Sequence, residues 1–308
     1  MFDLYLTYEY HFAATQLVLA MLGIGATLRA EDISRVFRFP TAFGLGLGMQ
    51  LLVVPLTAIV VGHLLAPHPG IVVGLVLVAT LPGGTMSNLL VYFSRASLAL
   101  SVSLTAVMTV GCLVTTPALL RLVAGPYLPD DFVMPVARVA FEMFVFLLGP
   151  LAAGMIVGRL APDHREPFAR WCIRGSLAVL SVIVVGASGA GRVDPVGFGV
   201  SGYVAIMTFC AIVVTSALLL GRATGLPAGD RCAIGIEVGI RNVNLGLLLK
   251  ASIFPAIPGV PDRLADGVLF ALLMYGAFGT TAAIVLALLH RRGLIVTREW
   301  HRPAQTHV

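Results

Sequence analysis

The chain has 308 residues, of which 58% are hydrophobic and only 11% are charged, so its composition excludes a water-soluble globular domain. The formal net charge of +5 comes from arginines in short segments between apolar stretches. This distribution indicates membrane topology and excludes a nucleic-acid partner. Apolar stretches of about 20 residues instead predict an all-α polytopic protein embedded in a lipid bilayer.

Charged and Pro/Gly-rich segments divide the chain into about nine apolar stretches, each expected to span the bilayer. They cover approximately residues 8–28, 40–65, 70–95, 97–122, 135–158, 171–189, 197–221, 228–254 and 264–290. Because no long linker separates them, we expect one transmembrane domain over residues 1–308. The start of the chain has no basic segment before its apolar run, so no signal peptide is predicted.

Arginines follow the first, third, fifth, seventh and ninth stretches, and few lie in the alternate segments. The positive-inside rule therefore predicts a cytoplasmic C-terminus, with residues 291–308 as a cytoplasmic tail, and an external N-terminus in a plasma (inner) membrane. The four cysteines have no paired spacing and lie in or beside apolar stretches, so we interpret them as small hydrophobic residues.

The third stretch is interrupted by Pro82-Gly-Gly-Thr-Met-Ser-Asn88. Proline removes a backbone donor and each glycine costs about 1 kcal/mol in a helix, so the sequence predicts two half-helices with a break between them. The eighth stretch carries Glu237-Val-Gly-Ile-Arg-Asn-Val-Asn244 at its centre. Polar groups at this depth must face protein or water. A satisfied polar pair inside an intact helix is the structural alternative for this second segment.

The two interrupted stretches occupy matching places in an inverted repeat of stretches 1–4 and 6–9. Such pairs of broken helices mark the substrate site of many secondary transporters. The start of each half-helix favours an anion, and exposed carbonyl oxygens favour a small cation. A carboxylate with hydroxyl and amide oxygens would complete a cation site.

At these residues the sequence resembles the bile acid:sodium symporter family and its bacterial homologues. The resemblance covers nearly the whole chain and is most specific at 82–88, at Leu98-Ala-Leu-Ser-Val-Ser-Leu-Thr105 and at Glu237-Val-Gly-Ile-Arg-Asn242. It implies two broken helices that cross in a core domain (about 40–122 and 197–290). A panel domain (about 8–28, 135–158 and 171–189) would move against this core.

The resemblance also implies a first sodium site. Its expected ligands all carry oxygen: Ser87, Asn88, Ser101, Thr105 and Glu237. Ser101 and Thr105 are four residues apart and so share a helix face. Taken alone, they are more typical of helix packing in membranes.

The second implied sodium site is altered. The family pattern places there Gln50, Glu237 and the backbone near Val238 and Ile240, but Arg241 stands where a glutamine is expected. A guanidinium has no lone pair for Na⁺, and it follows Glu237 by four residues, close enough for an ion pair. We hypothesise that Arg241 acts as a fixed cation, leaving one Na⁺ or none. Coupling to protons, or loss of coupling, is the rival possibility.

Gly84, Thr85 and Asn242 are the candidate substrate-binding residues, because family substrates bind near the crossing. The implied substrate is a small organic anion, bile acid-like or a small carboxylate. The sequence does not fix the oligomeric state.

Other functions share some of these sequence features. An uncoupled channel or facilitator would share the broken helices. An intramembrane serine protease would use Gly-x-Ser-Gly at 186–189 or 199–202, but every histidine lies near a segment end. Nothing points to a receptor.

Two charged features lie outside the breaks. Arg138 and Glu142 are expected to form an interfacial pair four residues apart. Lys250 is expected to extend its ammonium group to the outer membrane surface.

Overall fold

The computed structural model describes residues 2–28, 40–66, 68–124, 127–128, 132–194 and 196–294. Its regular elements are helical; the short elements named η are π-helical. In chain order they are α1 (Phe2–Thr27), α3 (Pro40–Gly48), η2 (Met49–Val53), α4 (Val54–Leu65), α5 (Pro69–Thr80), α6 (Thr85–Ser94), α7 (Leu98–Leu119), η3 (Leu120–Ala124), α8 (Val136–Met143), η5 (Phe144–Leu148), α9 (Gly149–Leu160), α10 (Arg165–Gly189), α11 (Gly199–Ala223), α12 (Ala228–Gly239), α13 (Val243–Ile253) and α14 (Arg263–Arg291).

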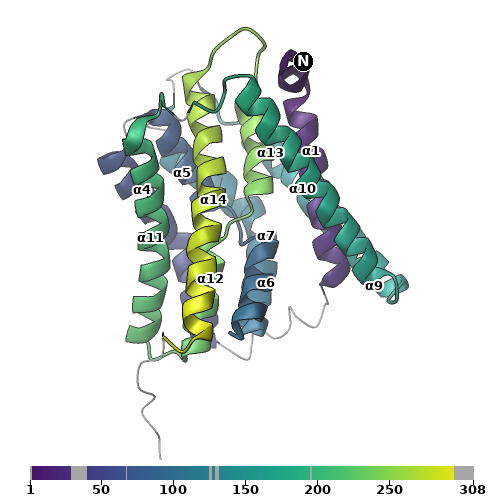
Figure 1. Cartoon of the computed structure of the whole chain (residues 1–308), viewed down its shortest axis with the longest axis vertical. Helices are drawn as coiled ribbons and strands as arrows, with labels where there is room; N and C mark the ends of the chain where they lie inside the picture. Colours follow the sequence, from purple (N-terminus) through teal and green to yellow (C-terminus); the bar gives the residue numbers. More distant parts are fainter. Residues whose placement is uncertain are drawn as a thin grey trace, which may run out of the picture.

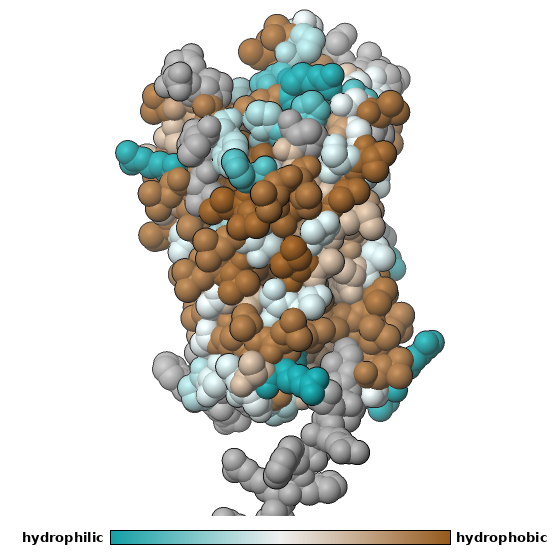
Figure 2. Space-filling model, turned by 90° about the vertical axis from the view of Figure 1, so that its left-hand side faces the viewer, coloured by the Kyte–Doolittle hydropathy of each residue, from teal (hydrophilic) through white to brown (hydrophobic). Residues whose placement is uncertain are grey.

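Seven continuous helices within these described ranges are long and apolar enough to cross a membrane. Three of them join consecutive elements: α3–η2–α4, α7 with η3, and α8–η5–α9. Figure 2 shows hydrophobic side chains across the middle of one face and hydrophilic ones towards both ends. Such a belt suits lipid contact, so the chain is an all-α, multi-pass membrane protein.

The third and eighth predicted spans are each built from two half-helices. α5 ends at Thr80 before Pro82, and α6 begins at Thr85; α12 ends at Gly239, and α13 begins at Val243. No single half-helix is long enough to cross a bilayer. The number nine therefore remains a prediction, although both predicted breaks are present.

The helices form two groups. α1 packs along α9 and α10, while α5, α11, α12 and α14 pack among themselves (Figure 1). We call α1, α8, η5, α9 and α10 the side layer. The bundle consists of the helices that carry the two breaks, together with α3–η2–α4, α7, α11 and α14. The side layer meets the bundle chiefly where α1 contacts α13.

Glycines allow α1 to lie directly on α9. A Cβ added at Gly25 would lie 2.1 Å from the Leu151 carbonyl oxygen, and one at Gly154 would lie 2.4 Å from that of Leu22. Small residues at such contacts let membrane helices approach each other, so packing fixes these two helices together.

We name the two ends of the molecule by α1. The upper face holds the start of α1, α13 and the start of α14, and the lower face holds the end of α1 and the free ends of α6 and α9 (Figure 1). Of the predicted tail, 291–308, the part after residue 294 lies outside the described residues. The four cysteines are buried and free, in keeping with their interpretation as small hydrophobic residues.

Candidate functional site

The two breaks cross and pair with each other in the middle of the bundle. Gly84 N–H donates to the Ile240 carbonyl (3.1 Å), and Asn242 N–H donates to the Pro82 carbonyl (2.9 Å). Gly83 and Arg241 form the antiparallel bridge between these bonds. Unpaired backbone groups are costly inside a membrane, so this short ladder makes both breaks tolerable.

Glu237, in the last turn of α12, contacts the first break at Gly83. A Cβ added at Gly83 would lie 1.8 Å from Oε1 of Glu237, so any larger residue there would displace the carboxylate or the break. The Glu237 side chain is fully buried. A carboxylate at this depth requires strong hydrogen bonds or a cation.

Three hydroxyl groups supply those hydrogen bonds. Thr105 lies 2.6 Å from Oε1 of Glu237, while Ser87 (2.7 Å) and Ser101 (2.9 Å) lie near Oε2. Ser87 comes from α6, and Ser101 and Thr105 come from one face of α7. Both carboxylate oxygens are thus surrounded by hydroxyl groups from two other helices.

Asn88 completes this group. Its Oδ1 lies 2.8 Å from the Ser101 hydroxyl, whose single hydrogen can go either to Asn88 or to Glu237, and its Nδ2 lies 3.4 Å from the Thr105 hydroxyl. The five residues of the predicted first sodium site therefore lie together. Oxygen atoms of carboxylate, hydroxyl and amide groups are ligands suited to a small hard cation.

Arg241 has a different neighbourhood from the one its spacing suggests. The chain is extended at Ile240, so Arg241 no longer follows Glu237 on a helix. No ion pair joins these two residues, both of which the structure describes. Instead, Arg241 Nη1 donates to Gln50 Oε1 (2.9 Å) and to the Leu81 carbonyl (3.0 Å). The expected Glu237–Arg241 pair is wrong because the break ends the helical register.

Two further donors lie beside the backbone oxygens of the predicted second site. The Ile240 carbonyl accepts from Gly84 N–H, and the Tyr275 hydroxyl lies 3.2 Å from the Val238 carbonyl and 3.0 Å from that of Gly239. Gln50 lies in the π-helical segment η2, a kind of distortion common at functional sites. Tyr275 was not anticipated, because nothing in its local sequence marks it.

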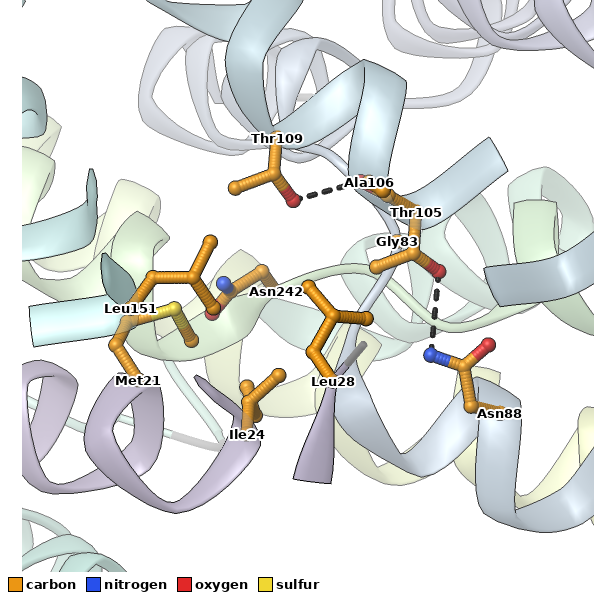
Figure 3. A pocket seen from close by; sticks show the side chains of 10 residues that line it. All are labelled: Met21, Ile24, Leu28, Gly83, Asn88, Thr105, Ala106, Thr109, Leu151 and Asn242. Carbon is orange, nitrogen blue, oxygen red and sulfur yellow. Dashed lines mark hydrogen bonds between the residues drawn. The ribbon is translucent and has the colours of Figure 1, made fainter. Parts of the chain in front are cut away.

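A small pocket lies between the crossing and the side layer (Figure 3). Its bundle side is lined by Gly83, Asn88, Ala106, Thr109, Asn242 and Thr105. The side layer contributes apolar side chains only, from Met21, Ile24, Leu28 and Leu151. The pocket thus has one polar wall, which includes two of the first-site residues, and one apolar wall.

The three candidate substrate residues differ in their relation to this pocket. Asn242 lines it, and its Oδ1 also accepts from Leu245 N–H (3.1 Å) as the cap of α13. Gly84 packs against the Arg241 backbone and does not line the pocket; Gly83 does. The side chain of Thr85 lies outside the described part of the chain.

The two charged features outside the breaks have different outcomes. Arg138 Nε pairs with Glu142 at 2.9 Å within α8, as predicted. Lys250 does not reach a surface: its side chain is fully buried and pairs with Glu9 of α1 at 2.6 Å. The interpretation of Lys250 is therefore wrong, because a partner 241 residues away in sequence neutralises it inside the protein.

Comparison with known proteins gives one consistent family. The model of the Sodium Bile acid symporter family matches residues 14–192. The Bacillus subtilis "Uncharacterized sodium-dependent transporter YocS" is 30% identical over 79% of this chain and 75% of its own. The mouse "Sodium-dependent organic anion transporter" is 27% identical over 86% of this chain and 70% of its own.

Plant chloroplast proteins are also similar. The rice "Probable sodium/metabolite cotransporter BASS2, chloroplastic" is 31% identical over 76% of this chain, and the Arabidopsis protein BASS1 of the same description is 29% identical over 83%. This chain spans only 55% and 64% of their respective lengths.

Proposed function

The chain belongs to the Sodium Bile acid symporter family, and from that premise we propose that it is a secondary transporter that couples a small organic anion to Na⁺ by alternating access. This family consists of transporters, not enzymes, so the protease alternative is set aside. The observation that carries the proposal is the shell of three hydroxyl groups around the buried Glu237 carboxylate, beside the pocket.

In the proposed first site, Na⁺ is held by Ser87, Asn88, Ser101, Thr105 and Glu237. When the ion binds, the hydroxyl hydrogens would turn away from Glu237. The hydroxyl oxygens and the carboxylate would then both coordinate the ion. The negative charge of Glu237 is costly in a buried site unless a cation balances it. Binding of Na⁺ beside the carboxylate is therefore favoured. Since the same Asn88 and Thr105 line the pocket, an ion and a substrate would interact at close range.

The substrate-binding region is the pocket, with Asn242 as the polar contact. The half-helices α6 and α13 both begin at the crossing, and their N-terminal ends favour a negative group. The apolar wall of the side layer would hold a hydrocarbon portion. A small carboxylate therefore suits the character of the pocket walls, and a bile acid-like anion would require the side layer to move away from the bundle.

Arg241 acts, in our proposal, as a built-in cation at the second site. Its guanidinium already occupies the Gln50 oxygen, and neighbouring carbonyl oxygens are bonded to Gly84 and Tyr275. The fixed positive charge of the guanidinium beside these oxygens then disfavours a second Na⁺. The expected stoichiometry is one Na⁺ per substrate.

Reconstituted vesicles test the main proposal. Vesicles with an inward Na⁺ gradient should accumulate a labelled organic anion, and the same vesicles in choline should not. Equilibration without accumulation would support a facilitator or channel instead. Accumulation driven by a pH gradient without Na⁺ would establish proton coupling.

Arg241→Gln tests the one-ion proposal. The variant should regain a second ion site, so the Hill slope for Na⁺ should rise from about one towards two. Arg263→Gln removes an arginine at a helix start whose side chain is 67% exposed and should leave the slope unchanged. An unaltered slope and Na⁺ affinity in Arg241→Gln would count against the fixed-cation role.

The movement and orientation are also proposals. We infer that the side layer acts as the panel and the bundle as the core, and that the upper face is external. Impermeant thiol labelling of single cysteines at the two faces, in right-side-out and inverted membranes, would test the orientation.

A further inference from the structure

Two ion pairs, one buried and one partly buried, connect the side layer to the bundle at the upper face. Glu9 of α1 pairs with Lys250 of α13, and Arg192, just after α10, pairs with Asp266 of α14. Each pair takes one partner from each helix group. The Arg138–Glu142 pair differs, because both of its partners belong to α8.

The Glu9–Lys250 pair is deeply buried. Lys250 has a fully buried side chain and that of Glu9 is only 7% exposed, while their charged atoms lie 2.6 Å apart. Removing such charges from water costs several kcal/mol per ion unless both partners stay together. Separating the two helices at this point would therefore strand two charges unless water enters between them.

A third contact lies deeper along the same two helices. Gln16 of α1 donates to Oδ1 of Asn244 at 2.9 Å, one residue into α13. The Gln16 side chain is fully buried. α1 and α13 are thus joined at two depths, from the upper face down towards the crossing.

The lower half of the same interface is different. There the side layer presents Met21, Ile24 and Leu28 to the pocket, with no ion pair across the gap among these lining residues. The interface is therefore charged and closed above the pocket, but apolar beside it. When such an interface opens, water can solvate separated charges, whereas exposed hydrocarbon gains no hydrogen bond from it.

We propose that Glu9–Lys250 and Arg192–Asp266 form a lock that closes the pocket to the upper face and separates each time the pocket opens to that face. This inference rests on the alternating access of the proposed function. The lock sets the populations of two conformations, one closed and one open at the upper face. Its contacts exist only in the closed conformation, so they stabilise that conformation alone.

Distances between spin labels test the lock without measuring transport. Tyr8 on α1 and Val200 at the start of α11 are exposed positions on the two groups, so each can be changed to a labelled cysteine. The parent has its four buried cysteines replaced by alanine and must keep the elution profile of the unmodified chain. Pulsed electron resonance then gives the distribution of distances across the upper face.

The decisive variant removes both charges of one pair, Glu9→Gln with Lys250→Met. Replacing both partners leaves no orphan charge, so folding should persist. We expect a longer-distance population at least several-fold larger than in the parent. The reversed pair, Glu9→Lys with Lys250→Glu, should restore the parent distribution.

The matched control is Arg138→Met with Glu142→Gln, which removes a pair inside α8 and should leave the distances unchanged. If the Glu9/Lys250 variant does not fold, Arg192→Gln with Asp266→Asn provides the same test at the second pair. Parent-like distances in the folded variant overturn the lock. Failure of Na⁺-driven uptake by the unmodified chain would instead overturn the transporter proposal and leave the distance result intact.

Discussion

Thr105 of α7 donates a hydrogen bond to Oε1 of Glu237 on α12, at 2.6 Å, and so connects a continuous helix to the end of a broken one. The same hydroxyl lies 3.0 Å from the Ser101 carbonyl, a bond it could make inside its own helix. A single hydroxyl hydrogen can serve only one of these acceptors. The Thr105 oxygen can therefore turn a lone pair towards a cation while its hydrogen returns to the helix.

Thr105→Val should lower the affinity for Na⁺ about tenfold, since one ligand or hydrogen bond is worth roughly 1–2 kcal/mol. The substitution keeps the shape of the side chain. Thr109→Val is the matched control: it lines the same pocket, but its hydroxyl donates to the Thr105 carbonyl and not to Glu237. Half-saturating Na⁺ in uptake or in thermal stability measures both. Equal effects of the two variants would remove Thr105 from the ion site.

Glu237→Gln should abolish the stabilisation of the protein by Na⁺. A ligand present at 100 times its Kd stabilises the folded state by about 2.7 kcal/mol, so the melting temperature of the parent should rise with Na⁺ and not with K⁺. The neutral variant keeps its hydrogen-bonding size but lacks the charge that holds the ion. Glu142→Gln, a buried carboxylate on α8, should retain the response. A sodium response that persists in Glu237→Gln would refute the first site.

Features of this site that depend on neighbouring residues could be predicted from the sequence, whereas contacts between distant residues could not. The breaks at Pro82 and at Glu237–Asn244 follow from local chemistry, because proline, glycine and polar side chains act on their own backbone. The grouping of hydroxyl residues around Glu237 was expected only through the family resemblance. Spacing alone leaves Ser101 and Thr105 as ordinary packing residues.

The predictions for Arg241 and Lys250 are wrong, because each used the local helix pattern alone. Arg241 lies beyond a helix break, and Lys250 has a partner far away in the sequence. Arg241 was expected to pair with Glu237 because residues four apart meet on a helix, but the helix ends at Gly239. Lys250 was expected at a surface because it lies late in its span. Its partner Glu9 is 241 positions away, and no periodicity in either segment indicates that contact.

Gly83→Ala should eliminate Na⁺-dependent behaviour even though it adds a single methyl group. The new Cβ would lie 1.8 Å from Glu237 Oε1, so the carboxylate or the break must move. Gly48→Ala is the control: nothing lies within 4 Å of its added Cβ, and alanine favours a helix by about 1 kcal/mol over glycine. Uptake and thermal melting check both variants. A Gly83→Ala protein with parental sodium affinity would mean that Glu237 tolerates displacement.

Gly154→Ala should destabilise the contact between α1 and α9. The added Cβ would lie 2.4 Å from the Leu22 carbonyl oxygen, which is backbone and cannot turn aside. Overpacking of this kind costs about 1–3 kcal/mol, so the melting temperature should fall by several degrees. Gly111→Ala on α7 meets nothing within 4 Å and should match the parent. A parental melting temperature for Gly154→Ala would show that the helices can slide apart without loss.

Asn242 has two roles that a pair of substitutions can separate. Its Oδ1 caps α13 through Leu245 N–H, and the residue also lines the pocket. Serine is nearly as good a helix cap, so Asn242→Ser should keep the thermal stability within about 1 kcal/mol of the parent. Because the serine side chain is shorter and has no amide, the same variant should raise KM for the organic anion by at least several-fold.

Asn242→Ala should show both losses, since alanine neither caps the helix nor reaches the pocket. Uptake kinetics and melting curves on the same preparations measure the two effects independently. If Asn242→Ser leaves KM unchanged, Asn242 serves the helix alone, and the polar contact of the substrate must come from elsewhere on the bundle wall. If the serine variant is unstable instead, the Asn242 amide group itself is needed to hold the crossing, because the cap alone would have been preserved.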